Sequence, residues 1–312
     1  RYMSVASHHP MNLGYDPTAL LEIADVVLVV DTAVPWLPAE HTVRDDVKVI
    51  QMAPDPLYGY VPIRGFPSDI ALTCTTALGL DALGKAMSAH EKDAKSRTES
   101  RRGDLATQHK EMRDDWQQRL KDSEDKDPIS PIWLTHCIDN IKDDDTIVIK
   151  ESALVASQID FSQAGTMLNA GAASGLGWGS GTALGAKLGA PDRLVISTHG
   201  DGAYMFGNPI SAHYVAAEQD LPILSVIFNN QLWNAVRRST VGLTPDGYAA
   251  KANRQPLTYF EGEQRYEKVV EVSGGYGEQV TSPKEVMGAL ERGLRAVNVE
   301  KRSAVINVVC TS

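Results

Sequence analysis

Short, continuous apolar runs alternate along most of the chain with segments whose apolar residues recur at helical spacing. The runs are rich in β-branched residues, as from Leu194 to His199, and turn-forming or polar residues bound them. Strands that are apolar at successive positions are typical of parallel sheets covered by helices on both faces. The pattern predicts an α/β protein with doubly wound parallel sheets. The expected strands are 25–30, 47–50, 70–73, 145–149, 194–199, 223–228 and 303–309.

The same pattern divides the chain into three parts. Two stretches alternate helix and strand, and between them more than half of residues 91–127 are charged, with both signs interspersed. Three of the few apolar residues there recur at i, i+4 and i+8 and give one helix a narrow apolar stripe; they are Met112, Trp116 and Leu120. We predict an α/β domain, a charged helical linker and a second α/β domain, at residues 1–88, 89–128 and 129–312.

Two short polar motifs stand at the ends of neighbouring predicted strands. Gly200-Asp201-Gly202 follows one strand, and Asn229-Asn230 follows the next. The segment between them reads as a helix, with Asn208 as N-cap and Pro209 at the first helical position. Because a β-α-β crossover makes its two strands parallel, both motifs lie at one edge of the sheet. One carboxylate with few other protein oxygens suits Mg²⁺, which completes its shell with substrate phosphates.

This pair of motifs resembles the diphosphate-binding motif of thiamine diphosphate (ThDP) enzymes, a GDG triplet followed by a double Asn. The resemblance extends over nearly all of the chain and is most specific here. It departs at Ala203, where the family often has Ser, and at Leu232, where Gly is common; a backbone contact tolerates both changes. What the resemblance implies is a set of Mg²⁺ ligands, namely Asp201, Asn230 and the backbone oxygen of Leu232. It also implies contacts to ThDP from Gly200, Asp201, Gly202, Ala203 and Asn230.

A glycine-rich run from Leu168 to Gly181 precedes this motif. Glycines permit close backbone approach to a ligand and close packing of the helix expected at 182–188. In the family this run carries a large apolar residue that props the cofactor between its two rings, and that position falls on Leu176, next to Gly175. A core leucine in a glycine-rich loop is the alternative.

Residues just past the double Asn face the substrate pocket in the family. Gln231 and Trp233 are therefore candidates, with Leu176, for catalytic residues that shape the substrate pocket. For Trp233, a role in packing alone is the alternative. His199 has the titration range of an acid or base, but a strand-end histidine with a hydrogen-bond partner is the simpler interpretation.

Composition narrows the class of partner. The net charge of −10 argues against nucleic acid and anionic membranes, which need a basic face. No apolar run approaches the roughly 20 residues of a membrane span. Three scattered cysteines without a CxxC spacing favour buried structural thiols and a reducing, cytoplasmic setting.

The resemblance implies a ThDP- and Mg²⁺-dependent enzyme, similar to acetolactate (acetohydroxyacid) synthases and 2-oxo acid decarboxylases. Residues 1–88 look like the second half of that family's Rossmann-like central domain, with no residues to support FAD or ADP. The family's activating glutamate lies in a pyrimidine-binding domain, and none precedes Arg1. We expect a C-terminal portion or one subunit of a homo-oligomeric lyase or carboligase for a small 2-oxo acid, inactive without that domain.

Three alternatives remain open from the sequence. The β subunit of a 2-oxoacid:ferredoxin oxidoreductase carries the same motifs, but clustered cysteines would be expected. A non-catalytic ThDP-binding subunit is the second. A Mg²⁺-nucleotide module is the third, and it lacks the support of any GxxxxGK[ST] sequence.

Overall fold

The computed structural model describes residues 4–151, 153–170, 175–252, 254–260 and 262–311. The chain forms two compact units, one of residues 13–112 and the other of residues 1–12 with 113–312. The division falls inside a long helix, α3 (Glu91–Lys121), within the predicted charged linker. Domain boundaries at residues 88 and 128 stay a prediction.

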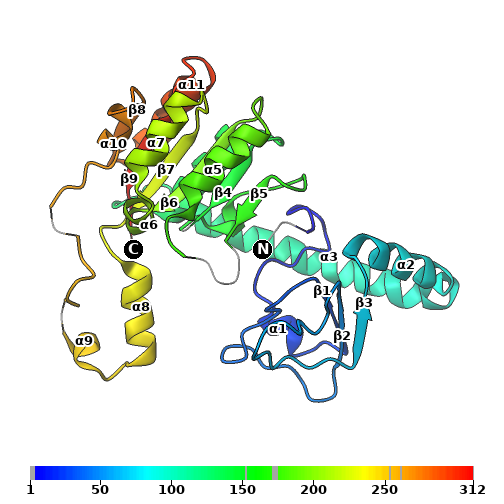
Figure 1. The fold of residues 1–312 in the computed structure, drawn as a ribbon. Helices are drawn as coiled ribbons and strands as arrows, with labels where there is room; N and C mark the ends of the chain where they lie inside the picture. Colours follow the sequence, from blue (N-terminus) through cyan, green and yellow to red (C-terminus); the bar gives the residue numbers. More distant parts are fainter. Residues whose placement is uncertain (1–3, 152, 171–174, 253, 261, 312) are drawn as a thin grey trace. The chain divides into compact units, whose positions relative to one another are not determined.

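The smaller unit contains a parallel three-stranded sheet in the order β1-β2-β3 (Figure 1). Alternate residues of β1 and β2 point to one face, where Val29 and Val49 pack with Leu21 and Trp36. The three apolar runs expected as strands in this unit, 25–30, 47–50 and 70–73, are strands. The observed bounds are the same for the third, begin one residue later for the first and second, and end at Ala53 for the second. The elements are α1 (Thr18–Leu21), β1 (Val26–Val30), β2 (Lys48–Ala53), β3 (Ile70–Thr73) and α2 (Thr76–Ser88).

The larger unit is built on a six-stranded sheet in the order β5-β4-β6-β7-β9-β8, and every neighbouring pair is parallel. The three central strands β6, β7 and β9 are buried along nearly their whole length, which explains their continuous apolar sequences. The strands are β4 (Ile147–Lys150), β5 (Met167–Asn169), β6 (Val195–Gly200), β7 (Leu224–Asn229), β8 (Tyr276–Val280) and β9 (Ala304–Val309).

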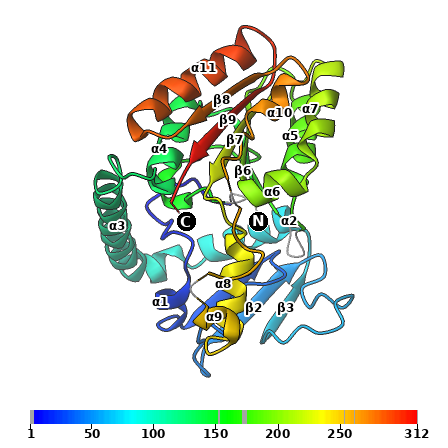
Figure 2. The same cartoon turned by 90° about the vertical axis from the view of Figure 1, so that its left-hand side faces the viewer.

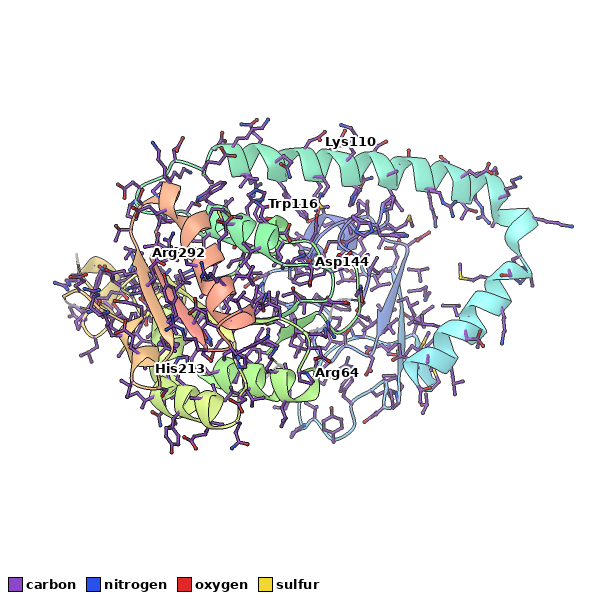
Figure 3. The ribbon with its side chains drawn as sticks, turned by 90° about the horizontal axis from the view of Figure 1, so that it is seen from above. Arg64, Lys110, Trp116, Asp144, His213 and Arg292 are labelled. Atoms are coloured by element: carbon purple, nitrogen blue, oxygen red, sulfur yellow. The ribbon has the colours of Figure 1, made fainter. Side chains whose placement is uncertain are left out.

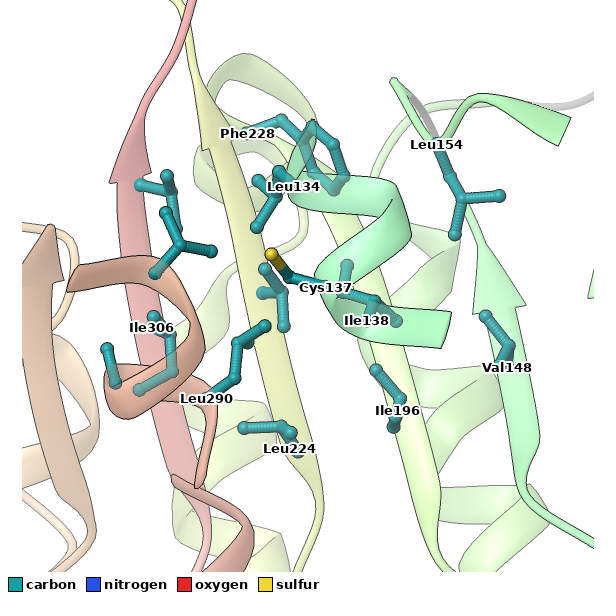
Figure 4. Packing of buried hydrophobic residues seen from close by; sticks show 14 of the residues in the cluster. Leu134, Cys137, Ile138, Val148, Leu154, Ile196, Leu224, Phe228, Leu290 and Ile306 are labelled. Carbon is teal, nitrogen blue, oxygen red and sulfur yellow. The ribbon is translucent and has the colours of Figure 1, made fainter. Parts of the chain in front are cut away.

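Helices cover both faces of this sheet, as Figure 2 shows. On one face, α4 and α11 pack on a core that includes Cys137, Ile196 and Leu224 (Figure 4). On the other face, α5 packs on β4 and β6. Val195, the residue next to Ile196 in β6, points to this second face and packs in a second core. The period-two alternation thus fills two cores from the same strands. The helices are α4 (Pro131–Ile141), α5 (Trp178–Gly189), α6 (Asp201–Phe206), α7 (Pro209–Glu218), α8 (Asn234–Leu243), α9 (Tyr248–Lys251), α10 (Lys268–Glu271) and α11 (Val286–Asn298).

The strand order reverses between β4 and β6. From β4 the chain crosses to β5 at one side, whereas from β6 it continues to β7 at the other side. The connections that leave the carboxyl ends of β4 and β6 therefore diverge, and open α/β sheets bind ligands in the crevice expected at such a point. The segment after β4 begins at Glu151, and the segment after β6 begins at Asp201.

Several local predictions need correction. The helix expected at 182–188 begins earlier, at Trp178, because the glycines at 179 and 181 are part of it. Helix α8 begins at Asn234, so the pocket candidates Gln231 and Trp233 lie in the loop before it. Asn208 does precede α7, but its backbone is left-handed (φ 49°) and its side chain donates to Ser211 Oγ, so it does not cap the helix as predicted. Strands β5 and β8 and helix α6 were not predicted, since each is short and carries polar or glycine residues.

Helix α3 carries charged side chains along most of its length, with Lys110 and Trp116 labelled in Figure 3. Its end belongs to the larger unit, where Leu120 is buried and Arg113 pairs with Asp160 at 2.7 Å. Two of the three cysteines, Cys137 and Cys310, are buried as predicted, while Cys74 is partly exposed. No helix in the described part of the chain combines the length and apolar character needed to cross a membrane.

A buried histidine, His213, lies on α7 and is labelled in Figure 3. His213 is 1% exposed, and its Nε2 shares a hydrogen bond of 2.7 Å with the Tyr204 hydroxyl. Burial, with a smaller contribution from His199, lowers the pKa of His213 from its ordinary 6.5 to about 4. The folded chain therefore holds this ring neutral at pH values where the unfolded chain protonates it.

This burial predicts a loss of stability in acid. Because the folded pKa of His213 is depressed, its contribution is complete above pH 6.5 and is lost as pH falls towards 4. The gap between the two pKa values corresponds to about 3 kcal/mol of unfolding free energy. Urea unfolding of the chain and of His213→Gln between pH 7 and pH 4 measures this. The stability difference between the two proteins should change by that amount across the range; a constant difference would contradict the prediction.

Candidate functional site

The carboxyl end of β6 places a buried carboxylate at the crevice. Gly200 ends the strand in an extended conformation, and Asp201 is the first residue of α6. Asp201 is 2% exposed, and its Oδ1 accepts a hydrogen bond of 2.8 Å from the N–H of Gly202. Its other oxygen, Oδ2, has no hydrogen-bond partner among the residues that the structure describes. A buried carboxylate oxygen without a donor is an unusual feature that calls for a ligand.

The surroundings of Asp201 penalise its negative charge. Burial raises the pKa of Asp201 to about 6, although the backbone N–H groups of Gly202, Gln231 and Leu232 act in the opposite direction. The two amides at 231 and 232 make their hydrogen bonds elsewhere, to the side chains of Asn229 and Asn230. A cation beside Oδ2 would favour the ionised form and remove the penalty.

The two asparagines after β7 have different environments. Asn229 is 1% exposed, and its amide donates to Asn307 Oδ1 at 3.1 Å while its Oδ1 accepts from Gln231 N–H. Asn230 is only partly buried, and its Oδ1 accepts from Leu232 N–H at 3.1 Å. Asn229 therefore fixes the loop, and the second lone pair of Asn230 Oδ1 is open to a ligand.

The loop beyond Asn230 is held by backbone pairing. Gln231 is exposed and has a left-handed backbone (φ 57°). Leu232 forms an antiparallel bridge with Tyr259, with bonds from Trp233 N–H to the Thr258 carbonyl and from Phe260 N–H to the Gln231 carbonyl. These bonds do not use the Leu232 carbonyl oxygen, which stays a predicted Mg²⁺ ligand.

Trp233 packs on the glycine of the first motif. Its indole meets the Phe260 ring edge to face, with centroids 5.2 Å apart. A Cβ atom on Gly202 would lie 2.5 Å from Cε3 of Trp233, so the indole covers the Gly202 backbone directly. The packing interpretation of Trp233 thus accounts for its position in the structure, whereas contact with a substrate by Trp233 or Gln231 stays a prediction.

This contact predicts the effect of enlarging Gly202. We expect Gly202→Ala to lower the unfolding free energy by about 1–3 kcal/mol, because the new methyl group displaces the partly buried Trp233 ring. Adding Trp233→Leu should recover part of that loss, and the double-mutant cycle measured by urea unfolding reports the coupling. Additive effects of the two changes would contradict the contact.

The glycine-rich turn lies on the other side of the crevice, after β5. Gly175 and Leu176 are described and exposed, with 44% of Leu176 accessible, whereas residues 171–174 of the run lie outside the described residues. Leu176 is therefore not a core leucine, and its role as a wedge stays a prediction. Gly177 has φ 86°, and its Cα lies against Gly207, after α6.

The structure also shows two site residues that sequence reasoning did not assign. Glu151, at the end of β4, accepts hydrogen bonds from Gly177 N–H, from Gly179 N–H at 3.2 Å and from His199 Nδ1 at 2.8 Å. Burial acts to raise the pKa of Glu151, but His199 and the two amides outweigh it and hold that pKa below its usual value. The sequence offered one signal for Glu151, namely a charged residue directly after the buried apolar strand β4. His199 has the hydrogen-bond partner that the simpler interpretation expected.

Comparison with known proteins decides the family. Residues 151–308, just over half of the chain, match the model of the C-terminal TPP-binding domain of thiamine pyrophosphate enzymes, TPP being ThDP. The chain belongs to the thiamine pyrophosphate enzyme family. The matched range begins at Glu151 and includes the glycine-rich turn and both motifs. The resemblance inferred from the GDG and double-Asn motifs is confirmed.

Relatives of this TPP enzyme chain include synthases, lyases, decarboxylases and acetyltransferases. It is 32% identical over 214 residues to a probable acetolactate synthase of Mycobacterium bovis, covering 66% of this chain and 36% of that protein. It is 33% identical over 146 residues to a 2-hydroxyacyl-CoA lyase of Oryza sativa subsp. japonica, covering 46% and 23%. The chain thus spans about a third or less of the length of these curated relatives.

A solved structure shows the same fold over almost the whole chain. The ThDP-dependent 4-hydroxybenzoylformate decarboxylase of Rhodococcus jostii RHA1 aligns with a TM-score of 0.67 and 21% identity. The alignment covers 98% of this TPP enzyme chain and 54% of the decarboxylase. The predicted α/β architecture with parallel sheets is confirmed.

Proposed function

We propose that this chain carries the diphosphate-binding half of a ThDP- and Mg²⁺-dependent enzyme that cleaves or forms a carbon–carbon bond next to the carbonyl of a 2-oxo acid. The observation that carries the proposal is the buried Oδ2 of Asp201, which has no hydrogen-bond partner among the described residues and lies where the strand order reverses between β4 and β6. Asn230 follows the neighbouring strand β7, whose parallel register with β6 brings both motifs to one edge.

The donor set fits Mg²⁺. Among the described residues, no group of three or more His, Cys, Asp and Glu side chains lies close enough to hold a metal ion. A metal here would have one carboxylate, Asp201, with the Asn230 amide oxygen and the Leu232 carbonyl. Such a set suits Mg²⁺, which takes its remaining oxygens from phosphates and water. It is a poor match for zinc, copper or nickel, which favour imidazole or thiolate ligands.

The surrounding backbone fits a diphosphate. Gly200 has no side chain and Ala203 has only a methyl group, so both permit close approach of a ligand beside Asp201, the first residue of α6. Contact of Gly202 with the diphosphate would use the part of its backbone that the Trp233 indole does not cover. Leu176 and Gly175 on the glycine-rich turn would contact the rest of the cofactor. Bound ThDP supplies a nucleophilic carbon and then an electron sink for the bond-breaking step. The residues of this chain hold the diphosphate and the metal, and Leu176, Gln231 and Trp233 shape the cavity.

The relatives support the substrate class and the need for a partner. Their names describe acetolactate synthases, 2-hydroxyacyl-CoA lyases and benzoylformate decarboxylases. We infer the same class of 2-oxo acid chemistry for this chain. The activating glutamate and the pyrimidine-binding domain would come from the part of these longer proteins that the chain does not span, within a homo-oligomer.

The test begins with the protein as its cell makes it. The chain is tagged, purified, and every copurifying chain is identified by intact mass and terminal sequence. Release of CO₂ from a panel of 2-oxo acids is then measured with ThDP and Mg²⁺, with EDTA, and without ThDP. We expect turnover that requires both ThDP and Mg²⁺. ThDP binding by the same purified material is also measured, with Mg²⁺ and with EDTA. Binding that is no tighter with Mg²⁺ than with EDTA refutes the proposal.

A further inference from the structure

We propose that Glu151 and His199 are a positioning pair that holds the glycine-rich turn, residues 175–179, in its cofactor-binding conformation and ties it to the GDG motif. This inference rests on the proposed function, because it assigns the pair a role in binding ThDP. Both residues act through other groups, and neither is assigned contact with the reacting atoms.

The pair is completely enclosed by the larger unit. The side chain of Glu151 is 1% exposed, and that of His199 is 0% exposed. Glu151 Oε1 accepts from Gly177 N–H, and Oε2 accepts from both Gly179 N–H and His199 Nδ1. One carboxylate thus receives three donors from two segments of the chain. A buried carboxylate with this many donors has a fixed orientation, so it can define the position of the turn.

Glu151 also replaces a missing helix cap. Gly177 is the N-cap of α5 and has no side chain to accept a bond from the first helical turn. Glu151 takes the N–H of Gly177 and of Gly179, the second residue of the helix, from a different strand. Its negative charge also suits the N-terminus of a helix. The left-handed backbone of Gly177 is therefore stabilised by β4, and Leu176 immediately precedes it.

Space around the pair explains one glycine of the run. A Cβ atom on Gly179 would lie 2.6 Å from Oε2 of Glu151 and 2.8 Å from Cε1 of His199. The same atom on Gly175 or Gly181 would meet nothing within 4 Å. Glycine at 179 is required by Glu151 and His199, not by a ligand.

His199 connects this arrangement to the diphosphate motif. It occupies β6 immediately before Gly200, so its ring is anchored by the strand that delivers Asp201. Its edge contacts the Tyr204 ring of α6 at a centroid distance of 5.6 Å. A displacement of the Glu151 carboxylate therefore moves the glycine-rich turn relative to Asp201. Asp201 itself, which we call the anchor, keeps its own contacts.

The test separates the turn from the anchor. Glu151→Gln keeps the size of the side chain but replaces one acceptor oxygen with an NH₂ group, which cannot accept an N–H bond. In the full chain, amide hydrogen exchange is expected to accelerate about 10-fold at Gly177 or at Gly179, whichever N–H faces the new NH₂ group. This is the factor for one lost hydrogen bond of ordinary strength. Amides of β7 should keep their protection. Glu278→Gln, in an ion pair on β8 and α11, is the matched control and should leave Gly177 and Gly179 unchanged.

Binding with Mg²⁺ provides the second readout. Glu151→Gln should weaken ThDP about 10-fold and inorganic diphosphate less than about twofold, because the Asp201 anchor stays intact. General destabilisation would weaken both ligands equally, and that result overturns the proposal, as does unchanged exchange at Gly177 and Gly179. Both ligands are measured on the assembled protein. If the unaltered assembled protein binds neither ligand, the proposed function fails, whereas the exchange measurement still decides whether Glu151 positions the turn.

Discussion

Asp201→Ala is expected to abolish Mg²⁺-dependent binding of ThDP by the assembled protein. The side chain is the only carboxylate in the proposed ligand set, and its Oδ2 is buried without a donor among the described residues. Loss of a metal ligand should cost at least as much as loss of the groups that orient ligands, so affinity should fall at least about 100-fold. Titration calorimetry with ThDP, in Mg²⁺ and in EDTA, measures the change. Retained binding of normal affinity would refute the assignment of Asp201.

The control variant is Asp192→Asn. This exposed aspartate precedes β6 at the opposite end of the strand, so the change removes the same charge away from the crevice. It should leave ThDP affinity unaltered.

In the metal-free chain, Asp201→Asn should raise the unfolding free energy by about 1–3 kcal/mol, because a desolvated carboxylate is costly when one oxygen has no donor among the described residues. Mg²⁺ with diphosphate should raise the melting temperature of the unaltered chain and of Asp192→Asn, but not that of Asp201→Asn.

Gly177→Ala should be among the most destabilising single changes in the larger unit. At φ 86° an alanine is strained, and its Cβ would lie 2.5 Å from the Cα of Gly207. The strained φ angle and the Gly207 Cα atom both belong to the backbone, which cannot rotate away as a side chain can. We expect a loss of about 2–5 kcal/mol in unfolding free energy from strain and overpacking together. Urea unfolding at neutral pH measures it.

Gly181→Ala is the matched comparison in the same glycine-rich run. Gly181 lies inside α5, and a Cβ atom there meets nothing within 4 Å. Alanine favours a helix over glycine by about 1 kcal/mol, so this variant should be as stable as the unaltered chain or more so. Equal losses for the two variants would show that the turn is not constrained as the structure indicates.

The comparison of these two glycines shows where sequence reasoning stops. In the sequence, Gly177 and Gly181 are equivalent members of one run that signals close approach of backbone. Only the fold separates them, because the partner of Gly177 is Gly207, 30 residues later and across a βα unit. The start of α5 at Trp178 was missed for a related reason, since its capping acceptor, Glu151, is supplied by another strand.

The sequence by itself determined the parallel α/β architecture and the pairing of Asp201 with the double Asn at one sheet edge. Both follow from local rules: buried parallel strands need continuous apolar runs, and a βαβ crossover fixes direction. Only the tertiary structure distinguished Asn229, locked to Asn307, from the more accessible Asn230, and found Glu151 beneath the glycine-rich turn. Those contacts join residues 26 to 78 positions apart, and no local pattern encodes which distant side chain a buried polar group will meet.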